Sequence, residues 1–238
     1  MTIRILVLGA GATPDGQHEP IWLAERQGEL LIERLVQACA RLHGTMIFAA
    51  RRSDIAKFHL DSVASLAATD AVVVPVEGPT QGAACTALLC LDHIEPTSEL
   101  LILNGNEFID ADYEATVTDF RSRDLDAGLI VFPSLHPRYS YVRLDENRLV
   151  EEAAEKHPIS RNAIAGFFWF RKGREFVEGA KAMIGKDAHH NGHFYMSLVL
   201  NELVLRQLRV GVAQIAADRY RPLKSRSQVA AYEEDASG

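Results

Sequence analysis

The sequence lacks the features that would place the chain in a membrane, on a nucleic acid or among disulfide-stapled proteins. Its 238 residues begin with an apolar run, residues 3–11, that reaches glycines too early to span a bilayer. The net charge is −7, and no basic block could neutralise a phosphate backbone, so neither membrane nor nucleic acid is expected as a partner. Three cysteines without a CxxC pair favour a reducing, cytoplasmic compartment.

Several catalytic signatures are also missing. The glycine-rich stretch GAGATPDG (9–16) lacks the third glycine of a dinucleotide fingerprint and the Gly-Lys-Ser/Thr of a phosphate-binding P-loop. No G-x-S-x-G elbow is present, which argues against a hydrolase of that type. His189, His190 and His193 have no cysteine or acidic partner at metal-ligand spacing. A polar loop before a helix is therefore favoured there over a transition-metal site.

What the first half does contain is a regular alternation of strand-like and helix-like segments. Short apolar runs bounded by turn residues predict strands, and apolar residues at helical spacing predict helices. The expected strands span 3–11, 44–50, 70–78 and 99–106, and the expected helices span 29–42, 82–94 and 113–124. This alternation predicts a largely parallel sheet with helices on both faces.

The second half changes rhythm and predicts antiparallel additions to the same sheet. Strands are expected at 127–134, 163–173 and 209–217, a hairpin at 139–156, and helices at 174–185 and 193–208. The chain is 47% hydrophobic, which is typical of a globular domain. We therefore expect a single α/β domain over 1–238, with three α/β/α layers and a mixed, largely parallel sheet. The polar end of the C-terminal tail 218–238 is expected to fray.

Two glycine-bearing turns follow predicted strands. The first is 9–16, and the second lies in EGPTQGAACTALL (77–89), where a helix begins near Gly82. Glycines and small residues allow a phosphate or a flat ring to lie against backbone N–H groups. Either turn alone is explained equally well by tight local packing. Two such turns at the carboxyl ends of strands favour a shared crevice.

Taken in order, seven segments resemble the sugar-1-phosphate nucleotidylyltransferase family, which has a GT-A-like α/β fold. The likeness is closest to a small branch found with capsule and surface-sugar genes. The segments are LGAGATP (8–14), PIWLAERQGELLIER (20–34), EGPTQGAACTALL (77–89), LLILNGNEFID (100–110), VEEAAEKHPIS (150–160), AIAGFFWF (163–170) and NGHFYMSLVLNEL (191–203).

The resemblance implies transfer of a nucleotidyl group from a nucleoside triphosphate to a sugar 1-phosphate or a similar phosphorylated acceptor. Pyrophosphate would be released, with Mg²⁺ or possibly Mn²⁺ as cofactor, in the synthesis of surface-polysaccharide precursors. A homo-oligomer is also compatible with the family. Residues 1–125 would then form a nucleotide-binding half, and residues 126–217 an acceptor half.

The resemblance also assigns roles to individual residues. The nucleotide would be held by Gly9, Ala10, Gly11, Thr80, Gly82, Ala83 and Asn104. The acceptor would be held by Glu155, Lys156, Gly166 and Asn191, with Glu155 on a hydroxyl and Lys156 on the phosphate. Lys156 and Asn106 would be the catalytic residues, and Asn106 and Glu107 the metal ligands. Without the resemblance, Lys156 reads as a solvated lysine and Asn106 as a turn former.

Three charges that the family pattern leads one to expect are changed in this chain. Ile21 stands where a phosphate-binding lysine is expected, Asn106 replaces a metal-binding aspartate, and His193 replaces a glutamate. Losing a charge aimed at a transition state typically costs about 100-fold or more in rate. Arg4, Arg26 or Lys224 could supply charge instead.

Two alternatives to the transferase therefore remain open. One is a catalytically degenerate nucleotide-binding, sugar-binding or regulatory homologue. The other is a GT-A-like glycosyltransferase with Asp110-Ala111-Asp112 as its D-x-D motif.

Overall fold

The computed structural model describes residues 3–11 and 19–234. At its centre is a nine-stranded mixed sheet with the strand order β10-β9-β11-β6-β1-β4-β5, in which β8 pairs with β11 and β12 pairs with β8. The strands β1, β4, β5 and β6 are mutually parallel, whereas β11 runs antiparallel to β6 and β8. The strand bounds are β1 Arg4–Leu8, β4 Thr45–Arg51, β5 Val72–Val76, β6 Leu100–Asn104, β8 Ala127–Pro133, β9 Tyr141–Leu144, β10 Val150–Ala154, β11 Asn162–Phe170 and β12 Val210–Gln214.

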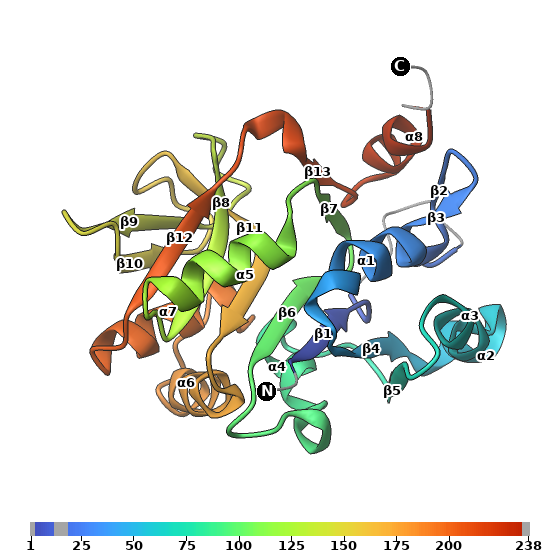
Figure 1. Ribbon diagram of the computed structural model, residues 1–238, viewed down its shortest axis with the longest axis horizontal. Helices are drawn as coiled ribbons and strands as arrows, with labels where there is room; N and C mark the ends of the chain where they lie inside the picture. Colours follow the sequence, from blue (N-terminus) through green and yellow to red (C-terminus); the bar gives the residue numbers. More distant parts are fainter. Residues whose placement is uncertain (1–2, 12–18, 235–238) are drawn as a thin grey trace.

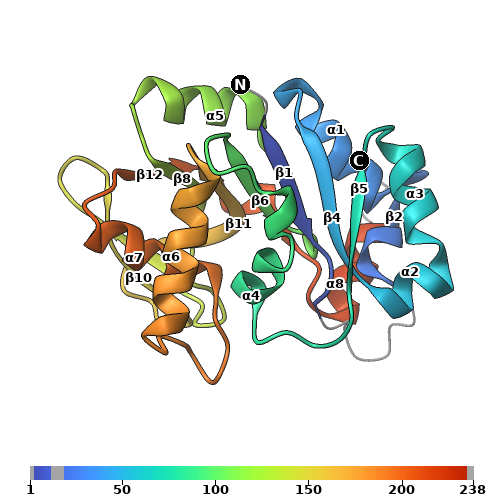
Figure 2. The ribbon, with the colours of Figure 1, turned by 90° about the horizontal axis from the view of Figure 1, so that it is seen from below.

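Helices cover both faces of this sheet, and in Figures 1 and 2 the β9–β10 hairpin and the α2–α3 pair lie at its opposite ends. The α-helices are α1 Leu31–Cys39, α2 Arg52–Phe58, α3 Leu60–Ala67, α4 Ala83–Leu88, α5 Tyr113–Ser122, α6 Gly173–Gly185, α7 Met196–Leu205 and α8 Arg226–Glu234. Short 3₁₀ turns lie at Ile21–Leu23, Ala40–Leu42, Leu91–His93 and Ala217–Arg219. Among the described residues, no helix has the length and apolarity needed to cross a membrane.

Alternation along the central strands separates two hydrophobic cores. On β1, Ile5 and Val7 join the core under α1, α3 and α5, while Leu6 and Leu8 join the core under α4, α6 and α7. Such alternation is required when both faces of a strand are covered, since successive side chains point to opposite faces. The three-layer, mixed α/β fold expected from the sequence is confirmed.

The parallel strands end in register at one edge of the sheet. Leu8, the last residue of β1, lies opposite Asn104 of β6 and Ala49 of β4, and Arg51 lies opposite Val76. The segments that follow β1, β4, β5 and β6 therefore emerge side by side. This edge is where open α/β sheets place their ligand crevices.

The end of the chain is built into the fold, so the expectation of a fraying tail is wrong through residue 234. Residues Tyr220–Pro222 form β13, which pairs antiparallel with β7 (Glu107–Ile109), beside α8 in Figure 1. Helix α8 buries Val229 and Tyr232 in the core, because these two residues, three apart, share one helix face. Residues 235–238 lie outside the described residues. A second small pairing, β2 (Glu25–Arg26) with β3 (Glu29–Leu30), was also not expected.

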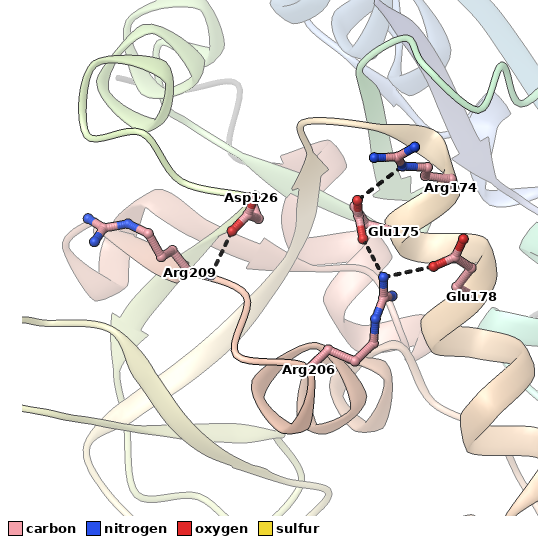
Figure 3. Close-up of polar contacts among 6 residues, drawn as sticks. All are labelled: Asp126, Arg174, Glu175, Glu178, Arg206 and Arg209. Carbon is pink, nitrogen blue, oxygen red and sulfur yellow. Dashed lines mark hydrogen bonds and ion pairs between the residues drawn. The ribbon is translucent and has the colours of Figure 1, made fainter.

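Helices α6 and α7 are tied together by ion pairs on the side of the fold drawn in Figure 3. Arg206, which follows α7, reaches Glu175 at 2.9 Å and Glu178 at 2.7 Å, both on α6. Arg174 approaches the other oxygen of Glu175 at 3.4 Å. Glu175 is 6% exposed, so its charge is matched where water cannot solvate it.

Candidate active site

A cavity of about 820 Å³ opens at the edge where the parallel strands end. Both glycine turns line it, as do the end of β6, the residues after β10 and the residues before α7. Of the residues assigned from the sequence, those that line the cavity are Gly9, Ala10, Gly11, Thr80, Gly82, Ala83, Asn104, Asn106, Glu107, Glu155, Lys156 and Gly166. The two turns and the Glu155–Lys156 pair, far apart in sequence, therefore share one space.

The first glycine turn is shaped by a tryptophan. The Gly9 N–H donates to the Ala49 carbonyl at 2.8 Å, which continues the β1–β4 pairing by one residue. A Cβ atom at Gly9 would lie 2.0 Å from the Trp22 ring, and one at Gly105 would lie 2.3 Å from the Trp22 indole nitrogen. Both glycines are thus needed to seat Trp22 beneath the cavity. Residues 12–18, the rest of this loop, lie outside the described residues.

The second glycine turn is fixed to the segment that precedes α7. Gly82 has φ 113°, and a Cβ atom there would lie 2.5 Å from the Phe194 carbonyl oxygen. The Phe194 N–H donates to the Gln81 carbonyl at 2.7 Å, and the Phe194 carbonyl accepts from the Ala84 N–H at 3.2 Å. The Thr80 and Thr86 hydroxyls share a 2.6 Å hydrogen bond. These backbone contacts therefore fix the position of the start of α4 at the cavity.

Glu155 and Lys156, just after β10, line the same cavity as the two glycine turns. Glu155 is 7% exposed, and its Oε2 accepts hydrogen bonds from the Ser140 hydroxyl and, at 2.7 Å, from the Ser197 hydroxyl. These two donors satisfy a carboxylate that would otherwise be costly to bury. Glu155 is thus held in one orientation by Ser140, just before β9, and by Ser197 of α7.

Lys156 is exposed and projects into the cavity from a backbone with φ 54°. Its ammonium donates to the Tyr195 hydroxyl at 3.0 Å and lies 5.0 Å from the centre of that ring. The hydrogen bond to Tyr195 and, less strongly, the electrostatic interactions with Tyr195 and Glu155 raise the pKa of Lys156 above its ordinary value. The ammonium form is therefore favoured at the mouth of the cavity.

At the end of β6, a second buried carboxylate joins the C-terminal segment to the cavity. Glu107 is 2% exposed, and its Oε1 accepts from the Asn104 amide nitrogen at 2.7 Å. Its Oε2 accepts from the Tyr220 hydroxyl and pairs with the Lys224 ammonium at 3.2 Å. Burial, and then the charge of Glu107, raise the pKa of Tyr220 well above its usual value, so the phenol stays a donor. A Cβ atom at Gly166 would lie 1.6 Å from Glu107 Oε1.

The donor set at this strand end does not fit a Mg²⁺ or Mn²⁺ ion held by the protein. Asn106 offers a neutral carbonyl, and both Glu107 oxygens are already engaged by Asn104, Tyr220 and Lys224. Lys224 places a positive charge beside the position, which opposes a divalent cation. In the described ranges 3–11 and 19–234, no group of three or more His, Cys, Asp or Glu side chains could hold a metal.

Several sequence-assigned residues lie elsewhere. Asn191 is exposed in a turn with φ 50° and does not line the cavity. Asp112 caps the N-terminus of α5 by accepting from the Ala115 N–H at 2.9 Å, and Asp110 is likewise outside the cavity, so the D-x-D triplet does not face it. Arg4 pairs with Glu95 away from the site.

The cavity also holds charged residues that the sequence reasoning did not single out. Arg51 is the last residue of β4 and pairs with Asp54 at 3.0 Å. Arg138 is exposed, lies 4.8 Å from the centre of the Tyr139 ring, and makes no ion pair with another described residue. Ile21, 9% exposed, lines the same cavity. No pattern in the sequence distinguishes Arg138, because it lies in an irregular loop before β9.

Two further positions named from the sequence are Arg26, a candidate source of charge, and His193, which replaces an expected glutamate. Arg26 does not line the cavity, and its guanidinium lies 5.5 Å from the centre of the Tyr232 ring. His193 lines the cavity from a short backbone bridge with His190, ahead of α7. The residues 193–195 are not helical, since α7 begins at Met196. The spacing of His190 and His193 therefore does not place them on one helix face.

Two solved structures with the same fold carry the names of sugar-nucleotide enzymes. A nucleoside-diphosphate-sugar pyrophosphorylase from Vibrio cholerae RC9 matches with a TM-score of 0.83 at 18% identity, over 96% of this chain and 99% of that one. A candidate glucose-1-phosphate thymidylyltransferase from Bacillus anthracis, in complex with a sucrose, matches with a TM-score of 0.78 at 14% identity, over 99% and 95%. At these identities the likeness establishes the fold.

The family follows from the sequence model that the chain matches. A search of curated proteins matched none. The family model described as nucleotidyl transferase matches residues 24–191, which is most of the chain and includes the second glycine turn, the end of β6 and the Glu155–Lys156 pair. The chain belongs to the nucleotidyl transferase family.

Proposed function

We propose that the chain transfers a nucleotidyl group from a nucleoside triphosphate to a sugar 1-phosphate, or to a similar phosphorylated acceptor, and releases pyrophosphate. In this proposal residues 1–125 hold the nucleotide and residues 126–217 hold the acceptor. The product would be a precursor for surface polysaccharides, as the sequence resemblance implies.

The observation that supports the proposal best is the convergence on one cavity. The turns at Gly9–Gly11 and Thr80–Ala83 bring backbone to the cavity, and Glu155 and Lys156 bring a carboxylate and an ammonium to it. A volume of about 820 Å³ is within the range of small-molecule sites. A nucleotide between the turns would place its phosphates toward Lys156 and Arg138.

The chemistry asks little of the protein beyond alignment and charge. The acceptor phosphate oxygen attacks the α-phosphorus, a new P–O bond forms, and the bond to the pyrophosphate oxygen breaks. Lys156 would position the acceptor phosphate, and Glu155, held by Ser140 and Ser197, would accept a hydrogen bond from an acceptor hydroxyl. Charge held by Lys156 and Arg138 stabilises the transition state without reorganisation.

One observation favours the non-catalytic alternative. Ile21 lines the cavity and is buried, so the position expected to carry a phosphate-binding lysine contributes no charge. A binding or regulatory protein would tolerate that loss, whereas a transferase must recover the charge from another residue. The two functions share the cavity and differ in turnover.

An assay of pyrophosphate release distinguishes the transferase from the binding protein. Purified protein would be given each nucleoside triphosphate together with a panel of sugar phosphates, with Mg²⁺ or Mn²⁺ present as the counterion of the triphosphate. Lys156→Ala is the test variant, and Lys181→Ala is its matched control, because Lys181 is exposed on α6 outside the cavity.

Release with one nucleotide–acceptor pair, lost in Lys156→Ala and kept in Lys181→Ala, supports the transferase. Nucleotide-induced stabilisation without pyrophosphate release from any pair supports the binding protein. Activity that survives Lys156→Ala unchanged would contradict the acceptor assignment.

A further inference from the structure

We infer that the Lys224 ammonium, held in place by Glu107 and Tyr220, is the built-in cation that meets the triphosphate at the end of β6. It stands where a transferase of this design would otherwise need a protein-bound divalent ion. The inference rests on the proposed function, because it names the group that recovers the charge missing at Ile21.

The Glu107 carboxylate and the Lys224 ammonium differ in their exposure to the cavity. The Glu107 side chain is 1% exposed and the Lys224 side chain is 45% exposed, with 3.2 Å between their charged atoms. Lys224 also donates to the Tyr220 hydroxyl at 3.4 Å. An ammonium has three donors, so two are used inside and one remains for the cavity that both residues line. The carboxylate, by contrast, is sealed by Asn104 and Tyr220 and presents little charge to a phosphate.

The backbone on both sides of Lys224 is fixed by hydrogen bonds. Pro222 pairs with Glu107 in the β13–β7 ladder, and the Leu223 N–H donates to the Asn106 carbonyl at 2.9 Å. On the other side, the Lys224 N–H donates to the Gln228 side-chain oxygen at 2.8 Å, at the start of α8. The charge is therefore preorganised over the strand end, which is the condition under which electrostatic stabilisation is most effective.

An ammonium and a protein-bound metal would compete for this position. Within β6, β7 and the turn between them, all of which the structure describes, Glu107 is the sole acidic side chain that lines the cavity, and Lys224 already neutralises it. A divalent ion on Glu107 would have to displace the ammonium or sit beside it, against the repulsion between like charges. Replacing Lys224 by an acid would reverse that balance.

The test measures nucleotide affinity without relying on turnover. Calorimetric titration with each nucleoside triphosphate is carried out in EDTA and again in excess Mg²⁺, with wild type, Lys224→Met, Lys224→Arg and Lys224→Asp. Lys181→Met is the control for loss of a lysine outside the cavity. Thermal melting of each variant confirms that it is folded.

The inference predicts that wild type binds a triphosphate in EDTA and that Lys224→Met weakens this binding tenfold or more. Lys224→Arg keeps most of the affinity, and Lys181→Met keeps all of it. Lys224→Asp binds only when Mg²⁺ is present. Undiminished binding by Lys224→Met, or wild-type binding that is abolished by EDTA, overturns the inference and leaves the proposed function standing. Absence of nucleotide binding under every condition overturns the proposed function and this inference with it.

Discussion

Two buried glutamates, Glu175 and Glu107, have different roles: one stabilises the packing of two helices, and the other lines the cavity. Glu175 on α6 is matched by Arg174 and Arg206, and Arg206 is matched again by Glu178, so the charges of this network, drawn in Figure 3, satisfy one another. Among the residues that the structure describes, Glu107 on β7 has one cationic partner, Lys224, with Tyr220 and Asn104 as neutral donors.

The difference lies in what remains available. Neither Glu175 nor Arg206 lines the cavity, whereas Glu107 and Lys224 both do. The α6–α7 network therefore holds two helices together and offers nothing to a ligand. The Glu107 cluster joins the C-terminal segment to the sheet and leaves one ammonium donor facing the cavity, so it contributes to stability and binding together.

The largest effect is expected when a side chain is added inside the Glu107 cluster. In Gly166→Ala, the new methyl group would lie 1.6 Å from Glu107 Oε1 and 2.3 Å from the Asn104 amide nitrogen. We expect the free energy of unfolding to fall by about 3 kcal/mol, with loss of nucleotide binding, as measured by denaturant titration and calorimetry. The control on the α6 side is Gly185→Ala, where a Cβ atom meets nothing within 4 Å. There the free energy of unfolding should stay the same or rise by about 1 kcal/mol. A large loss of stability in Gly185→Ala would contradict the difference described between the two regions.

A crossed pair of substitutions should separate function from stability. Lys156→Ala removes an exposed cation from the cavity, and we expect kcat/KM for the acceptor to fall by about 100-fold with the melting temperature unchanged. Arg206→Ala removes the cation that joins Glu175 and Glu178, and we expect a stability loss of about 1–3 kcal/mol with kcat/KM unchanged. Steady-state kinetics and thermal melting on both variants check this. The reverse assignment of effects would contradict our description of the two regions.

The same substitution at Glu107 and at Glu175 tests whether the two carboxylates differ in their effect on nucleotide binding. In Glu107→Gln and Glu175→Gln, a buried carboxylate becomes a neutral amide, and each should lose about 1–3 kcal/mol of stability. Only Glu107→Gln should also weaken triphosphate binding, several-fold, because Lys224 loses the partner that fixes its position. Equal nucleotide affinities in the two variants would show that Glu107 is as purely structural as Glu175.

The smallest expected effect is a shift in pH dependence. The Lys156 pKa is raised chiefly by the hydrogen bond to Tyr195. The ammonium is present below that pKa and lost as pH rises through it, so activity that needs the charge falls on the alkaline side. In Tyr195→Phe the pKa moves back toward its ordinary value, and the alkaline limb of kcat/KM should move to lower pH. A limb that does not move would show that Lys156 does not control it.

The parts of the fold that follow local patterns could be predicted from the sequence. The apolar runs of β1, β4 and β6 are buried on both faces and carry a strong signal. Helix α2 was missed because none of its residues is buried, so its sequence shows no apolar stripe. The β7–β13 pairing was missed because it joins very short strands whose residues, such as Glu107 and Tyr220, lie 113 positions apart.

The site shows the same division. The glycine turns could be placed together because parallel strands end at a common edge. Lys224 could be proposed as a source of charge, but only the packing of β13 on β7 distinguishes it from Arg4 and Arg26. Asn191 was assigned to the acceptor from its motif, and the turn that carries it lies outside the cavity.

Hydrogen–deuterium exchange of the wild-type protein tests most directly whether one cavity serves both substrates. The account predicts that a nucleoside triphosphate slows exchange in both glycine-turn segments, residues 9–11 and 78–86. Adding the phosphorylated acceptor should then slow exchange around residues 152–158, while α6 and its ion pairs stay unchanged. Protection of only one glycine turn, or protection centred on α6 and α7, would contradict it.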